Sequence, residues 1–226
     1  MFPKSTYANR RGVLSGRIEH GLLLFPGNNE SPMNYADNCY PFRQDSTFLY
    51  YFGLAQPDLA AVIDVDEGSE TIFGDELTID HIVWMGDLPT IAERAGRAGV
   101  TDTRPSAELG EVVGRAVAAG RPVHFLPPYR ADRTILLADL LGIPVADVAS
   151  RASVDFIRAV VDQRSIKTDE EVAELDRAVD VSVDMHTAAI RMARPGMSEA
   201  EIAAEVERVA VAAGGRISFP VIATIR

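Results

Sequence analysis

The side chains that most often carry catalysis are few and scattered in this sequence. The histidines, His20, His81, His124 and His186, form no HExxH, HxH or cysteine–histidine zinc spacing. His186 falls four residues before Ile190 on the apolar stripe of an expected helix, which favours a packed histidine over a metal ligand. The sequence also contains no GxSxG, Walker or GxGxxG motif. The residues alone therefore predict no assembled catalytic site.

Two smaller groups of reactive side chains also favour structural interpretations. The stretch DVDEG at 64–68 spaces its carboxylates as a calcium loop does, but it lacks the further oxygen donors. An acidic hairpin turn is the better interpretation. The single cysteine, Cys39, has no histidine nearby and precedes an aromatic run, which predicts a buried, unreactive thiol. One cysteine excludes an internal disulfide and favours a reducing compartment.

A denser polar cluster stands directly before an aromatic run in YPFRQDSTFLYYFGL, residues 40–54. If this run is a strand, its side chains alternate between two faces, and both faces are apolar. A strand with two apolar faces is covered on both sides, so we expect it to be central in a sheet. Two interpretations of the lead-in stay open. In the first, Asp45 or Ser46 bonds nearby backbone in a turn and Arg43 is solvated. In the second, the two charges form an ion pair that fixes how the loop enters the strand.

Composition limits the class of protein. The chain has 226 residues, of which 47% are hydrophobic and 24% charged, as in ordinary globular proteins. An excess of 33 acidic over 22 basic residues gives a net charge of −11, which repels nucleic acid and anionic lipid. The apolar runs are too short to span a bilayer, and the first residues lack a signal-peptide pattern. We expect a cytoplasmic protein without nucleic-acid or membrane partners.

The first part of the chain alternates between strand and helix patterns. Helices are expected over 5–18, after caps at Thr90 and Ser106, and along a leucine stripe ending before Gly142. Strands are expected at 21–25, 47–54, 59–65, 70–74, 81–86 and 122–127, the third and fourth of these forming a hairpin. Interleaved strands and helices predict an α/β fold, a mixed sheet flanked by helices on both faces.

The second part, from about residue 153, is almost wholly helical. A capping box of Thr168 and Glu171 starts a helix that runs to about residue 192, and Ser198 with Glu201 starts another. Residues 217–225 are expected to begin a strand. A lone strand cannot satisfy its own backbone, so this part reads as the start of a second domain. The predicted division is 1–162 for the first domain and 163–226 for the second.

Four stretches resemble one family. FRQDSTFLYYFGL resembles the signature of the aminopeptidase P N-terminal domain, which precedes the pita-bread metallopeptidase domain in Xaa-Pro aminopeptidases. The residues that match this signature in order are Phe42, Arg43, Gln44, Asp45, Ser46 and Gly53. QRSIKTDEEVAEL is similar to the family's hinge, with Arg164 and Lys167 before a capped helix. RPGMSEAEIAAEVE and FPVIATI are similar to the second helix and first strand of the pita-bread domain.

The resemblance implies both a fold and an activity. The fold is a creatinase/aminopeptidase P N-terminal-like domain, followed by two helices and a strand of an incomplete pita-bread domain. The activity is release of the N-terminal residue from peptides with proline second, using two divalent metal ions, usually manganese. In the family the metal ligands follow the strand at which this sequence stops, so no residue here matches them. The chain alone is expected to be inactive and to serve in oligomerisation and in shaping the substrate cleft.

Two function classes remain open. One is the metallopeptidase, with prolidase and creatinase as relatives of the same architecture. The other is a non-catalytic module for peptide binding or oligomerisation. Family members commonly form dimers through the N-terminal domain, so we expect at least a dimer. An apolar stripe of Ile202, Val206 and Val209, expected to be exposed, also favours self-association.

The only tryptophan, Trp84, stands in HIVWMGDLP at the expected end of a strand. In one interpretation its ring packs the sheet against a helix and its N–H bonds locally. In the other it binds substrate, because loops after strands commonly build sites. The family to which the chain is similar has a Trp-x-Gly after the same strand, and in oligomers this loop can reach a neighbour's cleft. The resemblance thus implies an apolar wall for a substrate side chain or proline ring.

Overall fold

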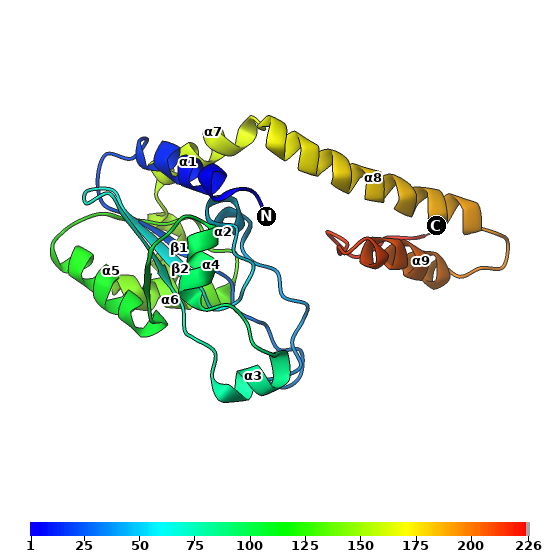
Figure 1. Cartoon of the computed structure of the whole chain (residues 1–226), viewed down its shortest axis with the longest axis horizontal. Helices are drawn as coiled ribbons and strands as arrows, with labels where there is room; N and C mark the ends of the chain where they lie inside the picture. Colours follow the sequence, from blue (N-terminus) through cyan, green and yellow to red (C-terminus); the bar gives the residue numbers. More distant parts are fainter. Residues whose placement is uncertain (225–226) are drawn as a thin grey trace. The chain divides into compact units, whose positions relative to one another are not determined.

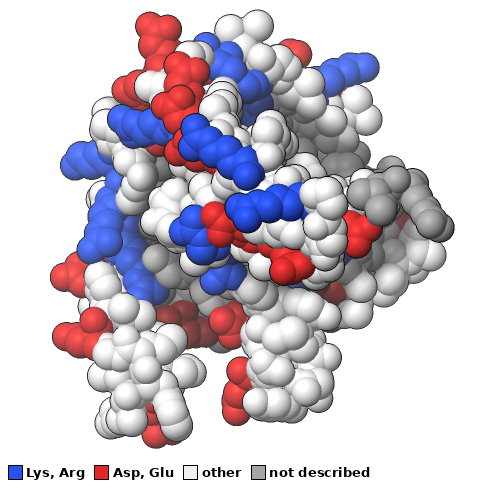
Figure 2. All heavy atoms as spheres, turned by 90° about the vertical axis from the view of Figure 1, so that its right-hand side faces the viewer, with Lys and Arg blue, Asp and Glu red and all other residues white. Residues whose placement is uncertain are grey.

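The computed structural model describes residues 1–224, and the chain divides into two compact units, Met1–Ser165 (unit 1) and Ile166–Arg226 (unit 2). In the described range, no helix combines the length and the apolar character needed to cross a membrane. On the face drawn in Figure 2, acidic and basic side chains are interspersed.

Within the described residues, one mixed sheet forms the centre of unit 1 (Figure 1). It has five strands in the order β4-β3-β2-β1-β5. The pairs β1–β2 and β2–β3 are antiparallel, whereas β1–β5 and β3–β4 are parallel. The predicted mixed sheet and its hairpin are therefore confirmed. The strands are β1 (Leu22–Pro26), β2 (Ala60–Asp64), β3 (Ser69–Phe73), β4 (Asp102–Arg104) and β5 (Val123–His124).

Helices cover both faces of this sheet. Alternation along β1 sends Leu23 and Phe25 into one apolar core and Leu22 and Leu24 into another. Residues of α1, α2, α4 and α7 fill the first core, and residues of α5 and α6 fill the second. These helices are α1 (Lys4–Ser15), α2 (Ser46–Phe52), α4 (Ile91–Arg97), α5 (Leu109–Ala118), α6 (Ala131–Leu141) and α7 (Val154–Ser165). Short 3₁₀ turns at Ser106–Glu108, Val145–Asp147 and Ala149–Arg151 complete the connections.

The aromatic run at 47–54 is not a strand, contrary to the prediction. It forms α2, because the Asp45 side chain accepts hydrogen bonds from the first amides of the helix. Gly53 ends the helix in the left-handed conformation, with φ of 65°. Phe48, Tyr51 and Phe52 are buried together, at helical rather than alternating spacing. The apolarity on both faces of the run thus reflects one buried helix face and a partly buried flank.

Residues 81–86 were also predicted as a strand, and this prediction is wrong. They lie in α3 (Ile79–Met85), which begins at a capping box of Thr78 and His81 and ends at Gly86. The expected cap at Thr90 is confirmed for α4, where Glu93 completes the box. Ser106 starts a 3₁₀ turn without capping through its side chain.

Unit 2 contains α8 (Asp169–Met192) and α9 (Glu199–Ala212), and the structure confirms both predicted capping boxes. The two helices pack on each other. The α9 residues Ile202, Val206 and Val209 are half-buried and not exposed as expected. The exposed apolar stripe instead lies on α8, at Val172, Leu175, Val179, Val183 and Ile190. The expected strand does not form over the described residues 217–224, and Ile225 lies outside them.

A buried arginine joins the elements on the first face of the sheet. Arg11 of α1 is fully buried, and its Nη1 donates to the carbonyls of Tyr51 (2.8 Å) and Ala98 (3.0 Å). Its Nη2 lies 2.8 Å from Oε2 of Glu70 in β3, and the guanidinium lies over the ring of Phe52. Burial lowers the pKa of Arg11, and the Glu70 carboxylate opposes that shift. Arg11 thereby connects α1 with α2, β3 and the end of α4.

We predict that Arg11→Met destabilises unit 1 by about 3 kcal/mol. The Glu70 carboxylate would lose its ion-pair partner, and the carbonyls of Tyr51 and Ala98 would lose their hydrogen-bond donor. Urea unfolding followed by circular dichroism measures this. Arg97→Met, on the exposed end of α4, is the matched control and should change stability by less than about 0.5 kcal/mol. A loss below about 1 kcal/mol for the Arg11 variant contradicts the assigned role.

Candidate functional site

The polar cluster before α2 is organised by Gln44, which is 3% exposed. Its Oε1 accepts from the backbone amides of Asn28 (2.6 Å) and Asp45 (2.8 Å), and its Nε2 donates to the carbonyl of Gln56 (2.6 Å). One side chain thus joins the chain leaving β1, the start of α2 and the loop before β2. Each of its amide atoms is matched to backbone, so Gln44 positions three segments and leaves no group for chemistry.

Asp45 acts as a helix cap and forms no ion pair with Arg43 in the part of the chain that the structure describes. Its Oδ1 accepts from the amides of Thr47 (2.8 Å) and Phe48 (2.9 Å), both in the first turn of α2. The Arg43 side chain is exposed, and its carbonyl accepts from Asn28 Nδ2. The interpretation of a backbone-bonding aspartate with a solvated arginine is therefore confirmed, and the ion-pair interpretation is wrong. Phe42, ahead of the cluster, is half-buried.

The far side of α2 contacts the last turn of α7. Nη1 of Arg164 donates to Oγ1 of Thr47 at 3.1 Å, and its guanidinium lies over the ring of Tyr50. The Tyr51 hydroxyl donates to Oε1 of Gln163 at 3.0 Å. The structure therefore brings Arg164 against the helix that follows the Phe42–Ser46 cluster.

Lys167 lies beyond Ser165, in the short connection before α8. The contributions of Asn28, Tyr51 and Gln163 were not foreseen. No local sequence pattern distinguishes Asn28 or Gln163 from other polar residues. Tyr51 was interpreted only as an apolar residue of a strand.

A small cavity of about 50 Å³ lies where the parallel strands β1 and β5 end. Its polar lining includes Asn28, whose Nδ2 donates to the Tyr129 hydroxyl at 3.0 Å, and Arg133, whose Nη1 donates to the Gly27 carbonyl. Burial is the main cause that raises the pKa of Tyr129, so its phenol stays protonated. Because ligand pockets usually measure about 300–1,000 Å³, this cavity has room for water and not for a peptide.

The described residues contain no cluster of three or more His, Cys, Asp or Glu side chains that could hold a metal ion. The two ring nitrogens of His124 contact Ser153 Oγ and the His20 carbonyl. Nδ1 of His81 accepts from the Thr78 amide in the capping box of α3. The described side chains therefore do not fit a metal centre, and we derive no catalytic step through them.

The other reactive groups have structural roles. Asp64 and Asp66 close the β2–β3 turn and pair with Arg121, which confirms the acidic hairpin turn. Cys39 is half-buried and not fully buried as predicted, and its thiol donates to the Ala36 carbonyl. Desolvation and the neighbouring Glu30 raise the pKa of this thiol, which leaves little reactive thiolate.

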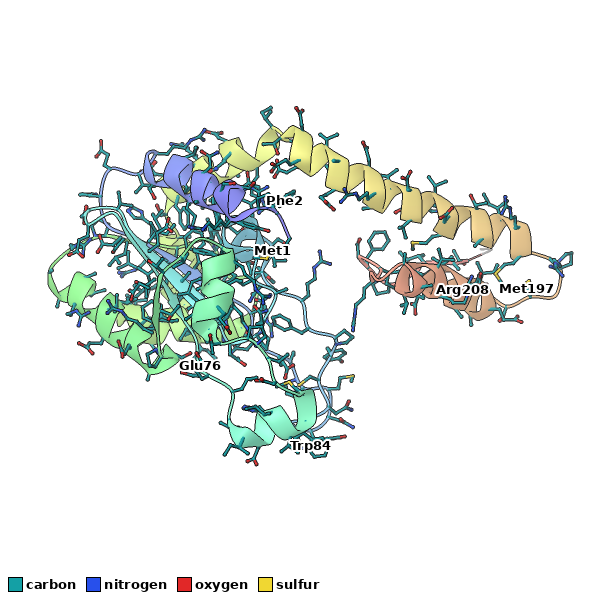
Figure 3. All side chains as sticks on the ribbon, in the orientation of Figure 1. Met1, Phe2, Glu76, Trp84, Met197 and Arg208 are labelled. Carbon is teal, nitrogen blue, oxygen red and sulfur yellow. The ribbon has the colours of Figure 1, made fainter. Side chains whose placement is uncertain are left out.

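Trp84 lies on α3 and is 87% exposed, so it does not pack the sheet against a helix. Figure 3 shows it on α3, away from the sheet. Ile79, Val83 and Met85 on the same helix are also exposed, and α3 has no buried residue. An exposed apolar helix of this kind is suited to contact another molecule.

Comparison with known proteins places these features in a family context. The model of the aminopeptidase P N-terminal domain matches residues 7–124, and that of metallopeptidase family M24 matches residues 173–226. A probable Xaa-Pro aminopeptidase of Metarhizium acridum is 27% identical over 232 residues, covering 98% of this chain and 43% of that protein. The human Xaa-Pro dipeptidase is 25% identical over 207 residues, covering 86% and 39%. The chain thus spans less than half the length of these relatives.

Solved structures share the fold. The low-pH form of aminopeptidase P from E. coli superposes with a TM-score of 0.75 at 23% identity, covering 95% of this chain and 50% of that one. The aminopeptidase PepP of Pseudomonas aeruginosa gives 0.77 at 24% identity, covering 94% and 50%.

We predict that Asp45→Ala lowers stability by about 1 kcal/mol, because two amides of α2 lose their acceptor. Asp45→Asn should recover most of this, since an amide oxygen also caps a helix. Thermal or urea unfolding of both variants provides the measurement. If the alanine and asparagine variants lose equal stability, the carboxylate has a role other than capping.

Proposed function

Because the chain belongs to the family of the aminopeptidase P N-terminal domain, we propose that it is the N-terminal part of a metal-dependent Xaa-Pro aminopeptidase. Such an enzyme releases the N-terminal residue from peptides with proline second. The observation that carries this proposal is the order of two matches in one chain, an aminopeptidase P N-terminal domain at 7–124 followed by M24 metallopeptidase sequence at 173–226.

The proposed domains are an ancillary domain, residues 1–162, and the start of a pita-bread catalytic domain, residues 163–226. The division into compact units after Ser165 supports a boundary in this region. The matches to the two families fall on either side of it.

The proposed enzyme uses two divalent metal ions, with manganese as the physiological pair. One similar solved structure is a zinc-substituted E. coli aminopeptidase P in complex with product, which supports a divalent-metal requirement for the family. The described residues do not form a metal site, so we propose that the ligands belong to a longer natural protein. The metals would activate a water and stabilise charge on the scissile carbonyl.

Unit 1 is proposed to act in oligomerisation and in shaping the substrate cleft, in a cytoplasmic protein that is at least a dimer. The exposed apolar face of α3, with Trp84 at 87% exposure, supports a contact with a second copy. In that arrangement the indole would offer an apolar wall to a substrate side chain or proline ring in the neighbouring subunit.

A prolidase is the second candidate function, because the human Xaa-Pro dipeptidase is among the relatives. Prolidases cleave dipeptides, whereas the proposed aminopeptidase accepts longer peptides. A non-catalytic module for peptide binding or oligomerisation is the remaining alternative.

We predict that residues 1–226 alone cleave no Xaa-Pro peptide with added manganese, whereas the longer natural protein cleaves Xaa-Pro-Xaa peptides. The reason is the missing set of metal ligands in the described residues. Chromatographic detection of the released N-terminal residue measures this, with a metal-only blank as control. Cleavage restricted to Xaa-Pro dipeptides favours the prolidase, and no cleavage by the longer protein favours a non-catalytic module.

For Trp84→Ala in the longer protein, we expect a fall in kcat/KM and weaker self-association with little change in melting temperature. An 87% exposed side chain contributes little to the stability of its own subunit. Peptide kinetics, light scattering and thermal unfolding on one variant give the three readouts. Val83→Ala, an exposed neighbour on α3, is the control for a general effect of apolar loss. Unchanged kinetics and assembly would remove Trp84 from the site.

A further inference from the structure

The last turn of α7 is the point at which the chain leaves unit 1, and the side chains around it come from α1 and α2. In Figure 1, α7 runs beside α1. Unit 1 ends at Ser165, the final residue of α7, and the M24 match begins at residue 173. This turn is therefore the last part of unit 1 before the connection that leads to the metallopeptidase-family segment.

Gln163 is the centre of the contacts on this turn. Its Oε1 accepts from the Tyr51 hydroxyl of α2 at 3.0 Å, and its Nε2 donates to the Arg10 carbonyl of α1 at 2.9 Å. Its own carbonyl accepts a long hydrogen bond of 3.4 Å from the Tyr50 hydroxyl. The last carbonyls of a helix lack partners within the helix, so this bond satisfies one of them.

These contacts require the side chains present. Tyr51 is fully buried, so its hydroxyl must find an acceptor inside the protein, and Gln163 supplies it. A glutamate could accept from Tyr51 but could not donate to the Arg10 carbonyl. An asparagine shortens the side chain by one methylene. Glutamine has the length, the acceptor and the donor that these two contacts need.

Three arginines, Arg10, Arg17 and Arg164, strengthen the same junction. The guanidinium of Arg10 lies 4.0 Å from the centre of the Tyr50 ring, and that of Arg164 lies 5.4 Å from it. Arg164 also donates to Thr47, and Arg17 of the chain after α1 donates to the Ala159 carbonyl. The end of α7 is thus attached to unit 1 by directional bonds and cation–π contacts, in addition to apolar packing.

We propose that α2 and α1 clamp the last turn of α7 through Gln163, and that this clamp keeps the turn closed against local opening at the point where the chain leaves unit 1 toward the metallopeptidase-family segment. Gln163 is the central positioning residue, and the Phe42–Ser46 cluster acts through α2, which it caps and orients. The statement about the metallopeptidase rests on the proposed function. The clamp itself is a property of unit 1 and is tested without any peptidase activity.

The test compares amide hydrogen exchange, resolved by mass spectrometry, in the 226-residue chain and its Gln163→Ala variant. Losing two hydrogen bonds should make amides of residues 161–165 exchange about tenfold faster by local opening. Amides of β1 and β2 should keep their wild-type rates. Trypsin should also cleave faster after Arg164 and Lys167. Arg158→Ala on the exposed side of α7 is the matched control and should leave both readouts unchanged.

Unchanged exchange in residues 161–165 of the Gln163 variant would overturn the clamp. An equal rise in β1 and β2 would also overturn it, because Gln163 would then be an ordinary contributor to global stability. If Gln163→Ala does not fold, Tyr51→Phe removes only the hydroxyl from the same bond, and the same two patterns decide. A longer protein that proves to be no peptidase would refute the proposed function while leaving these exchange results standing.

Discussion

The guanidinium of Arg11 lies where α1, α2, α4 and β3 meet, with no exposure to solvent. A buried charge is costly unless it is paired, and here the guanidinium forms an ion pair with Glu70 and donates from Nη1 to two carbonyls at helix ends, while Nε has no hydrogen-bond partner among the described residues. Tyr51 is one residue from the end of α2, and Ala98 follows the last residue of α4. Such carbonyls lack partners within their helices and carry the negative end of the helix dipole. One side chain therefore satisfies two helix ends and pairs with Glu70, which fixes α1, α2 and α4 against the sheet.

The position of α2 determines the rest of this side of the molecule. Arg11 holds its C-terminal end, Asp45 caps its first turn, and Gln44 joins that turn to the chain leaving β1. With both ends fixed, α2 presents Thr47, Tyr50 and Tyr51 to the end of α7. The polar residues Gln44 and Asp45 before α2 thus have structural roles. Trp84 differs, because α3 leaves it exposed.

Much of the fold could be predicted from local patterns, and the errors have a common cause. The strands β1, β2 and β3 and the caps at Thr90, Thr168 and Ser198 were predicted correctly, because apolar runs and capping boxes are local signals. The two helices predicted as strands, α2 and α3, are seven residues each, too short for periodicity to separate helix from strand. Their flanking residues carried the better signal, a cap at Asp45 or Thr78 and a glycine after the last turn.

The candidate site was predicted only in part. Arg164 bonds to Thr47 across 117 positions, and no local pattern indicates such a pairing. The family resemblance drew attention to the stretches around Thr47 and around Arg164, but it did not indicate that they are in contact. The exposure of Trp84 depends on α3 standing outside both cores, which follows from tertiary packing and not from the residues of the stretch.

Manganese titration followed by calorimetry tests most directly the proposal that this chain is part of a metallopeptidase but supplies none of its metal ligands. We predict no tight binding by residues 1–226, and two equivalents bound by a longer protein that contains the proposed ligands, because metal affinity requires a formed set of ligands. Stoichiometric, tight binding of manganese to residues 1–226 would contradict it.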